Sequence, residues 1–464
     1  MIQIDKRLSP AALAPAVSNA FAAAAPKLRA LNRRWNPADG APVFTVRGRY
    51  TSRGWTEWTQ GFQYGAALLE FDGTGEQEFL QMGREAVLRH MASHLTHTGV
   101  HDHGFNNVST YGNLLRLAEE GRFECSPEER MYHALALKVT GAVQAARWSP
   151  SSDGGGYIYS FNGPQSLFAD TIRSLRALSI SHQLGHVLMG EHDERINLLE
   201  RVIQHTETTA RTNVYFGKGR DRYDVRGRVA HESIFNFNDK RYRCPSTQQG
   251  YSPFSTWTRG LAWILCGCAE QLEWLAGIAP AEFTALGREK KSVMKLFLET
   301  AKATADFYIE HTPTDGVPYW DTGAPGLVHL GDYLDRPAEP FNEHEPVDSS
   351  AAAIAAQGLL RLGHYLSSSS TAKAGAIYTQ AGLTVARTLL GEPYLSRDKK
   401  HEGLLLHSVY HHPNGWDHIP KGRKVPCGES SQWGDYHLLE LAVYLQRLAR
   451  SEPYYVFFPT PVAR

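Results

Sequence analysis

The 464-residue chain has little cysteine, no excess charge of either sign and no long hydrophobic run. The cysteines are Cys125, Cys244, Cys266, Cys268 and Cys427. Their spacing matches neither a zinc site nor a disulfide framework. Its 48 basic side chains balance 48 acidic ones, whereas a nucleic-acid-binding surface needs a basic excess. We therefore expect no nucleic-acid partner. No apolar run reaches the roughly 18 residues of a membrane span, so we expect no membrane partner either.

The scattered cysteines also bear on the compartment. Few cysteines in an odd number favour a reducing environment, so we expect a cytoplasmic protein, with the periplasm as the alternative. Residues 11–25 are rich in alanine, and a secretory signal peptide is one interpretation of them. Pro15 interrupts this weakly apolar run, which favours an N-terminal helix instead.

Helical periodicity dominates the chain, and strand-like alternation is rare. The pattern predicts twelve helices, mostly in consecutive pairs. They cover residues 11–34, 60–71, 75–95, 106–118, 127–147, 165–184, 194–212, 255–276, 281–310, 348–367, 371–390 and 432–450. One helix of a pair is rich in small and apolar residues, as in 350–356, and its partner is charged and amphipathic, as in 288–293. This asymmetry is typical of an inner and an outer layer.

The two ends of the chain indicate how the pairs are arranged. Helices 11–34 and 432–450 are single, and pairing them completes a sixth hairpin. An open solenoid would instead need polar capping repeats at its ends. We therefore predict an all-α fold, an (α/α)6 barrel formed by residues 1–464 as one catalytic domain.

Four long irregular stretches separate the predicted helices. They are residues 148–164, 215–253, 312–347 and 396–431, all rich in glycine, proline and aromatic residues. Loops of this length in a compact domain are usually functional, so we expect them to build a cleft at one end of the barrel. The second stretch is predicted to contain a short β-hairpin turning at Asn238 and Asp239.

Aromatic side chains concentrate in these loops and at the starts of the apolar helices. They are Trp55, Trp58, Phe62, Tyr64, Trp257, Trp263, Trp320, Trp416 and Trp433. Flat apolar faces stack on sugar rings, while polar edges hydrogen-bond to hydroxyls. Any one of these residues is better explained by packing. As a set, they favour a carbohydrate substrate.

Two aspartates occupy positions where a carboxylate is costly. Asp102 precedes a predicted helix, and Asp170 lies in the apolar run 166–172, which we expect to be helical. Burial disfavours the charged form, so we expect a raised pKa for Asp170 that suits proton transfer near neutral pH. Structural alternatives stay open, because Asp102 would also suit an N-cap and Asp170 would also suit a bond to a neighbouring helix.

Histidines and one arginine complete the candidate chemistry. His101 and His103 flank Asp102 and are either its charge partners or surface loop residues. Their spacing lacks the additional ligands of a zinc site, so we expect no metal. Arg259 would hold a carboxylate as a fork-shaped partner, although a surface arginine beside core tryptophans is an equal alternative.

An ordered series of motifs runs through residues 50–450. The motifs are Trp58-Thr59-x-Gly61-Phe62, His101-Asp102-x-Gly104-Phe105, the segment with Asp170, Gln249-Gly250-Tyr251-Ser252, Trp257-x-Arg259-Gly260-x-Ala262-Trp263, Val317-Pro318-Tyr319-Trp320-Asp321, residues 348–355, Leu405-x-x-Ser408-Val409-Tyr410-His411 and Trp433-Gly434-Asp435-Tyr436. In these the chain resembles glycoside hydrolase family 88, the unsaturated glucuronyl hydrolases. The related family 105, which acts on unsaturated rhamnogalacturonan fragments, is the second resemblance.

The resemblance implies an (α/α)6 barrel and an uncommon reaction without a cofactor. Polysaccharide lyases leave a C4=C5 double bond on the non-reducing uronate, and enzymes of this family hydrate it, which releases the next sugar. By resemblance, Asp170 is the general acid and base and Asp102 the second essential carboxylate, which raises the pKa of Asp170. The implied substrate-binding residues are His231, Gln249, Arg259, Trp263, Trp58 and Phe62, the last two as a ring-stacking wall.

The chain also departs from the family pattern. Pro253 and Phe254 stand where acidic residues are common, the segment 215–229 is long and charged, and 326–345 is enlarged. These segments bear on what lies beyond the unsaturated sugar. A polysaccharide lyase or an inverting glycosidase on the same barrel is the enzymatic alternative, and a helical-hairpin carbohydrate-binding module is the non-catalytic one.

Overall fold

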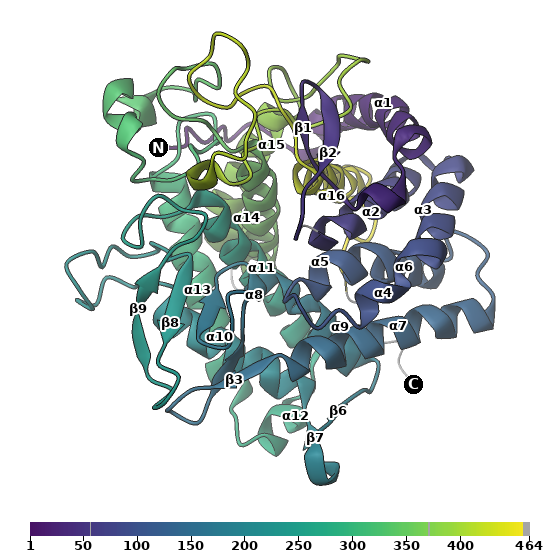
Figure 1. The fold of residues 1–464 in the computed structure, drawn as a ribbon, viewed down its shortest axis with the longest axis vertical. Coiled ribbons are helices and arrows are strands. Elements are labelled where there is room, and N and C mark those ends of the chain that lie inside the picture. Colours follow the sequence, from purple (N-terminus) through teal and green to yellow (C-terminus); the bar gives the residue numbers. More distant parts are fainter. Residues whose placement is uncertain (56, 370–371, 458–464) are drawn as a thin grey trace.

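A ring of inner helices forms the centre of the molecule (Figure 1). The structure, a computed structural model, describes residues 1–55, 57–369 and 372–457. The inner helices are α2 (Gln60–Thr74), α5 (His103–Asn107), α8 (Thr171–Ser174), α11 (Thr258–Gly277), α14 (Ser349–Ser369) and α16 (Gln432–Ala449). Each contacts the next in this order, and α16 contacts α2. The ring is therefore closed, and the predicted (α/α)6 barrel is confirmed.

A second layer of helices surrounds this ring. Its members are α1 (Pro10–Arg34), α3 (Gln77–His90), α7 (Pro127–Ala146), α10 (Leu198–Thr212), α13 (Lys290–Glu310) and α15 (Ala372–Leu389). Most residues of α11 and α14 are buried on all sides, whereas α3 and α13 bury one face. The small, apolar segments thus form the inner layer, as their composition predicts. The N-terminal α1 contacts the C-terminal α16 and α2.

Several predicted helices contain more than one helical element. The region 106–118 is one helical run, in which α5, a π-helical turn (Val108–Gly112) and α6 (Asn113–Glu119) follow each other directly. The region 75–95 contains α3 and the short α4 (Ala92–Leu95). The region 281–310 contains α12 (Pro280–Ala285) and α13, separated by Gly287 with φ +66°.

The prediction of a helix over 165–184 is wrong at its start. Residues Ser166–Phe168 form strand β5, and only then do α8 and α9 (Arg176–Gln183) follow. β5 pairs antiparallel with β8 (Glu232–Phe235), which pairs with β9 (Tyr242–Ser246). The predicted hairpin is thus present. Its first strand, β8, pairs with β5, a short apolar segment that periodicity alone cannot distinguish from helix.

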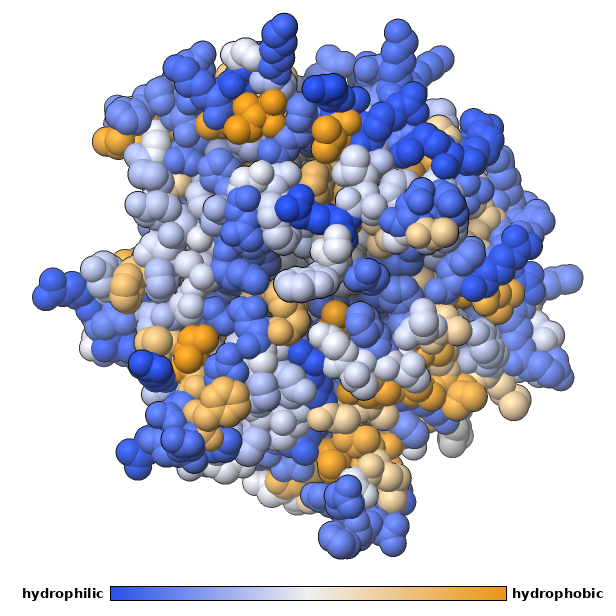
Figure 2. Space-filling model, in the orientation of Figure 1, coloured by the Kyte–Doolittle hydropathy of each residue, from blue (hydrophilic) through white to orange (hydrophobic). Residues whose placement is uncertain are grey.

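Three short hairpins decorate the loops. They are β1 (Pro42–Val46) with β2 (Arg49–Ser52), β3 (Trp148–Pro150) with β4 (Gly156–Ile158), and β6 (Leu188–Met189) with β7 (Arg195–Ile196). The face toward the viewer in Figure 2 is mostly hydrophilic, with separated hydrophobic patches. Among the described helices, none combines the length and the apolar character that a membrane crossing requires.

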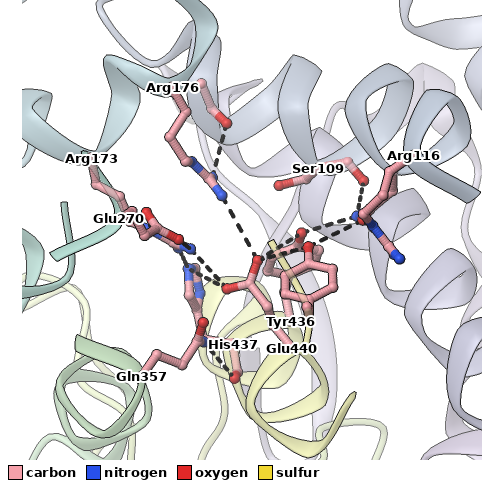
Figure 3. Close-up of polar contacts among 12 residues, drawn as sticks. Ser109, Arg116, Arg173, Arg176, Glu270, Gln357, Tyr436, His437 and Glu440 are labelled. Atoms are coloured by element: carbon pink, nitrogen blue, oxygen red, sulfur yellow. Dashed lines mark hydrogen bonds and ion pairs between the residues drawn. The ribbon is translucent and has the colours of Figure 1, made fainter. Parts of the chain in front are cut away.

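The barrel interior contains a buried ionic cluster, part of which is drawn in Figure 3. We call it the Arg–Glu cluster; its members are Arg173, Arg176, Arg361, Glu270, Glu273 and Glu440. Arg173 Nη2 donates to Glu270 Oε1 at 2.8 Å and to Glu440 Oε2 at 2.9 Å. Arg361 Nη1 donates to Glu273 Oε2 at 2.7 Å. These ion pairs join α8, α11, α14 and α16 across the centre of the ring.

Candidate active site

The two aspartates singled out in the sequence lie beside the same histidine. His101 Nε2 is 3.4 Å from Asp170 Oδ2 and 3.7 Å from Asp102 Oδ1. All three residues are buried, and one nitrogen and two carboxylate oxygens lie within 4.8 Å of one another. The fold therefore creates a compact pair of carboxyl groups with a shared basic neighbour. We call these residues the acid pair and its histidine.

A glycine allows this close approach. Gly104 packs so tightly on α8 that a Cβ at this position would lie 2.1 Å from the carbonyl oxygen of Ser174. The Gly104 N–H donates to Ser174 Oγ at 2.9 Å, and Ser174 Oγ donates to the His101 carbonyl at 2.7 Å. Gln144 from α7 donates to the same carbonyl at 2.7 Å. The segment carrying Asp102 is thereby fixed against the helix that Asp170 precedes.

The side chains of Asp102 and Asp170 do not serve as helix caps among the described residues. Asp102 stands at the N-cap position of α5 and Asp170 at that of α8, yet neither side chain accepts a capping hydrogen bond in the described part of the chain. The interpretation of Asp102 as a structural cap is therefore wrong. Asp170 Oδ1 is buried and has no hydrogen-bond partner among the described residues. A buried oxygen without a partner is costly, which is typical of a site that a ligand completes.

The two carboxyl groups differ in proton affinity. Burial raises the pKa of Asp102 to about 6; His101 opposes this shift, and the charge of Asp170 adds to it. Burial acts on Asp170 too, but the charge and the hydrogen bond of His101 lower its pKa. The expectation of a raised pKa for Asp170 is thus wrong for the protein without substrate. Close carboxyls titrate as a unit, and a proton shared by this pair favours Asp102 over Asp170.

The flanking histidines have separate roles. His101 is enclosed by Phe161, stacked at 5.7 Å between ring centroids, and by Phe168 at 5.6 Å. The paired carboxylates raise its pKa against the effect of burial. His103 instead lies 2.7 Å from Thr140 Oγ1 through Nδ1, and burial lowers its pKa to about 4. Both rings are buried, so the surface-loop alternative is wrong, and His103 is structural.

The same three groups bear on metal binding. One imidazole and two carboxylates can hold a divalent cation, and the atoms of His101, Asp102 and Asp170 are close enough to do so. They also suit proton sharing, because each of the three titrates. The absence of a metal from the reaction therefore stays a prediction.

Strand pairing brings His231 to the acid pair. The Ala169 N–H donates to the His231 carbonyl at 2.8 Å, which continues the β5–β8 ladder to the residue before Asp170. His231 Nδ1 accepts from the Gln248 N–H at 3.0 Å, and burial lowers its pKa to about 4. The neutral ring therefore carries its proton on Nε2. Within the described chain this buried Nε2 lacks a partner, so it is a donor available to a ligand.

Arg259 is committed to the protein itself. Its Nη1 donates to Asp348 Oδ2 at 2.8 Å and to the Val409 carbonyl, and its Nη2 donates to Tyr410 O at 2.8 Å and Gln249 Oε1 at 3.2 Å. All four terminal N–H bonds are used, so the expected fork for a substrate carboxylate is not available. The surface alternative is also wrong, because Arg259 is buried. Its contact with Oε1 orients Gln249, whose amide N–H groups are then the donors of that side chain.

Only one of the three predicted aromatic binding residues has an accessible ring. Trp58 is partly exposed and stacks on Trp433 at 5.2 Å. Phe62 is 0% exposed and Trp263 2% exposed, and both pack against Phe105. Phe62 and Trp263 therefore support the floor of the site from within the core, and a ring-stacking wall can use Trp58 but not Phe62.

Sequence reasoning missed residues that shape the site. Phe161 is 44% exposed and stacks on His101, and its place in the long 148–164 loop was the available signal. Tyr410 lies 6.3 Å from Trp58 between ring centroids and was visible only as part of a motif. Gln144 lies inside α7, where the sequence carries no sign that it contacts the His101 backbone.

Comparisons with known proteins find unsaturated glucuronyl hydrolases. No family model matches the chain. An unsaturated glucuronyl hydrolase of Formosa agariphila is 24% identical over 396 residues, which cover 84% of this chain and 80% of that protein. An unsaturated glucuronyl hydrolase of Bacillus sp. strain GL1 is 26% identical over 415 residues, covering 84% of this chain and 87% of that protein. The resemblance to the unsaturated glucuronyl hydrolases is confirmed.

Solved structures extend the likeness to the fold. A crystal structure of an unsaturated glucuronyl hydrolase specific for heparin matches with a TM-score of 0.70 at 18% identity. The match covers 94% of this chain and 98% of that one. The barrel of the unsaturated glucuronyl hydrolases is thus shared along nearly the whole length of both chains.

Proposed function

We propose that the protein is an unsaturated uronyl hydrolase of glycoside hydrolase family 88. It removes the 4,5-unsaturated uronic acid from the non-reducing end of lyase-made oligosaccharides by hydrating the C4=C5 double bond. The observation that carries this proposal is the acid pair, two buried carboxyl groups on either side of His101. A cytoplasmic location remains a prediction from the cysteine content.

The reaction needs one proton to be delivered and one to be recovered. A carboxylic acid protonates C4, and the ring oxygen stabilises the positive charge that develops at C5. Water bonds to C5 and loses a proton to the carboxylate, which restores the acid. The hemiketal then opens: C5=O forms and the bond from C5 to the ring oxygen breaks. Ring opening leaves a hemiacetal at C1, which expels the next sugar. Ordinary two-carboxylate glycosidases protonate the leaving oxygen directly, whereas this reaction does not need that step.

The two carboxyl groups of the acid pair have different roles in this proton transfer. We assign Asp170, beside the unpartnered space at its Oδ1, as the acid and base that faces C4. Asp102, with its pKa near 6, is the reservoir of the proton. The substrate's own carboxylate adds a negative charge next to the pair, and a nearby like charge raises carboxyl pKa values. Binding therefore favours the protonated acid that the first step uses.

The remaining residues bind and position the sugar. His231 Nε2–H and the Gln249 amide are the donors for the carboxylate or hydroxyls of the uronate, and the faces of Trp58 and Phe161 flank its ring. Arg259 acts through Gln249 and is therefore a positioning residue rather than a carboxylate ligand.

A panel of lyase-made unsaturated disaccharides tests the proposal, scored by loss of the ultraviolet absorbance of the conjugated uronate. The hydrolase removes this absorbance, and a polysaccharide lyase creates it. A carbohydrate-binding module leaves it unchanged with both the natural protein and Asp170→Asn. Unsaturated rhamnogalacturonan disaccharide belongs in the panel, because exclusive turnover of that sugar would assign the family 105 activity instead.

A further inference from the structure

Two exposed aromatic rings stack on each other at the margin of the loop region. Tyr223 and Phe254 have ring centroids 4.5 Å apart and an interplanar angle of 23°. Their side chains remain 43% and 44% exposed. Tyr223 comes from the long charged segment 215–229, and Phe254 directly follows Pro253. The two departures from the family pattern therefore meet and form one aromatic surface, which we call the Tyr223–Phe254 platform.

The loop that carries Tyr223 is rigidly braced. The Tyr223 N–H donates to Asp221 Oδ1 at 2.7 Å, and the other oxygen of Asp221 accepts from the Tyr215 hydroxyl at 3.1 Å. Asp224 accepts the N–H groups of Gly217, Lys218 and Arg220 at 2.7–2.9 Å. Because these bonds fix the turn before any ligand arrives, stacking on Tyr223 costs little conformational entropy.

The Phe254 side of the platform is connected through the chain to the active site. The Val229 N–H donates to Thr256 Oγ1 at 3.2 Å, which ties the two segments together. The next residue, Trp257, has its ring 4.8 Å from that of His231. Phe254 and Trp257 are three positions apart in the chain, so their Cα atoms are at most about 10 Å apart. A short segment thus links the platform to buried Trp257, which packs against His231 beside the acid pair.

The charges around the platform suit an acidic oligosaccharide. The carboxylates of Asp221 and Asp224 are turned to hydrogen bonds within the loop, whereas Arg222, next to Tyr223, is exposed. An exposed cation next in sequence to an aromatic residue matches a substrate chain that alternates sugar rings with carboxylates.

We propose that the Tyr223–Phe254 platform is a stacking subsite for a sugar beyond the leaving sugar, on the reducing side of the substrate. This inference rests on the proposed function for its direction along the substrate. The platform favours unsaturated tetrasaccharides over disaccharides, because only the longer chain reaches from the acid pair to the platform.

The test compares two lengths of one substrate, unsaturated chondroitin di- and tetrasaccharide. Tyr223→Ala and Phe254→Ala are each expected to lower kcat/KM for the tetrasaccharide about 3- to 10-fold, the scale of an aromatic stacking contact, with no comparable change for the disaccharide. Tyr223→Phe should retain the tetrasaccharide preference, because it keeps the ring. Phe237→Ala, which removes a ring 56% exposed at the β8–β9 turn, is the matched control and should change neither value.

A structural role for the ring pair gives a different result. If both substrates lose kcat/KM equally, or if neither does, the proposal is overturned. Calorimetric binding to Asp170→Asn separates the platform from the chemistry: the tetrasaccharide should bind more tightly than the disaccharide, and Tyr223→Ala in that background should remove the difference. If the natural protein leaves the double bond intact, the proposed function fails, and equal dissociation constants for the two lengths would in addition reject the platform.

Discussion

Carboxylates are buried in two regions of this barrel, and only one region is suited to chemistry. In the Arg–Glu cluster, Glu270 and Glu440 face Arg173 and are at hydrogen-bond distance from it. Burial favours their neutral form, but the arginines lower both pKa values. In the acid pair, the neighbour shared by both carboxyl groups is His101. Asp170 and Arg173 lie only three residues apart, yet they belong to different regions.

The difference shows that burial alone does not identify a catalytic acid. A guanidinium stays charged at all relevant pH values and fixes the charge of its partner. An imidazole titrates near neutrality, so the protonation of a nearby carboxyl can change during a reaction. Two carboxyl groups with one histidine therefore exchange protons, whereas glutamates among arginines stabilise the centre of the ring.

Removing a charge from the Arg–Glu cluster should have the largest effect, on stability alone. Glu270→Gln leaves Arg173 with a weakened buried pair, and breaking such pairs costs about 3–5 kcal/mol. We expect a loss of this size in the free energy of unfolding, measured in urea, with kcat per folded molecule nearly unchanged. Glu299→Gln, at an exposed pair with Lys295, is the control and should change stability by less than about 0.5 kcal/mol. A fully stable Glu270→Gln variant would contradict the structural role of the cluster.

The matched change in the acid pair should have the opposite profile. Asp170→Asn removes the proton donor, so kcat should fall at least ~10²-fold, the scale of general acid–base catalysis. The unfolding midpoint should stay the same or rise, because a buried charge is removed. Steady-state loss of ultraviolet absorbance and urea unfolding measure the two effects. The exposed Asp332→Asn is the control, and near-normal turnover by Asp170→Asn would refute its assigned role.

Gly104→Ala tests how the fold holds the two acids together. The new Cβ would meet the Ser174 carbonyl oxygen at 2.1 Å, and overpacking of this kind costs typically about 1–3 kcal/mol. Because α5 must move away from α8, kcat should fall together with stability. Gly277→Ala, where a Cβ meets open space among the described residues, should affect neither. A normal kcat in a destabilised Gly104→Ala protein would show that the spacing of the acids is not critical.

The pH dependence should distinguish the reservoir from the acid. Protonated Asp102, with its pKa near 6, is present below pH 6 and disappears above it. If its proton is needed, kcat/KM falls as pH rises through about 6, approaching about tenfold per pH unit. Asp102→Asn should abolish this limb of the profile measured on an unsaturated disaccharide. An unchanged limb in that variant would assign the titration to another group.

Much of the fold follows from the sequence for a clear physical reason. The inner helices α11 and α14 contain small and apolar residues on all sides, and such helices must be buried. Strand β5 could not be predicted, because its partner β8 lies in a distant loop, and tertiary pairing decided between helix and strand. The short apolar run before Asp170 is compatible with both.

The sequence selects residues for the candidate site but does not show how they interact. The motifs select Asp102, Asp170, His231 and Gln249, which the structure brings to one region. The sequence does not reveal that Arg259 is paired with Asp348, since those residues are far apart along the chain. It also does not reveal which carboxyl holds the proton, because that depends on the position of His101.

Turnover of an unsaturated disaccharide in D2O, followed by NMR, tests the central claim most directly. Hydration by the acid pair predicts loss of the alkene signal and one new carbon–deuterium bond at C4 of the released uronate at early times. Release of the neighbouring sugar with the C4=C5 double bond intact and no deuterium at C4 would contradict the account.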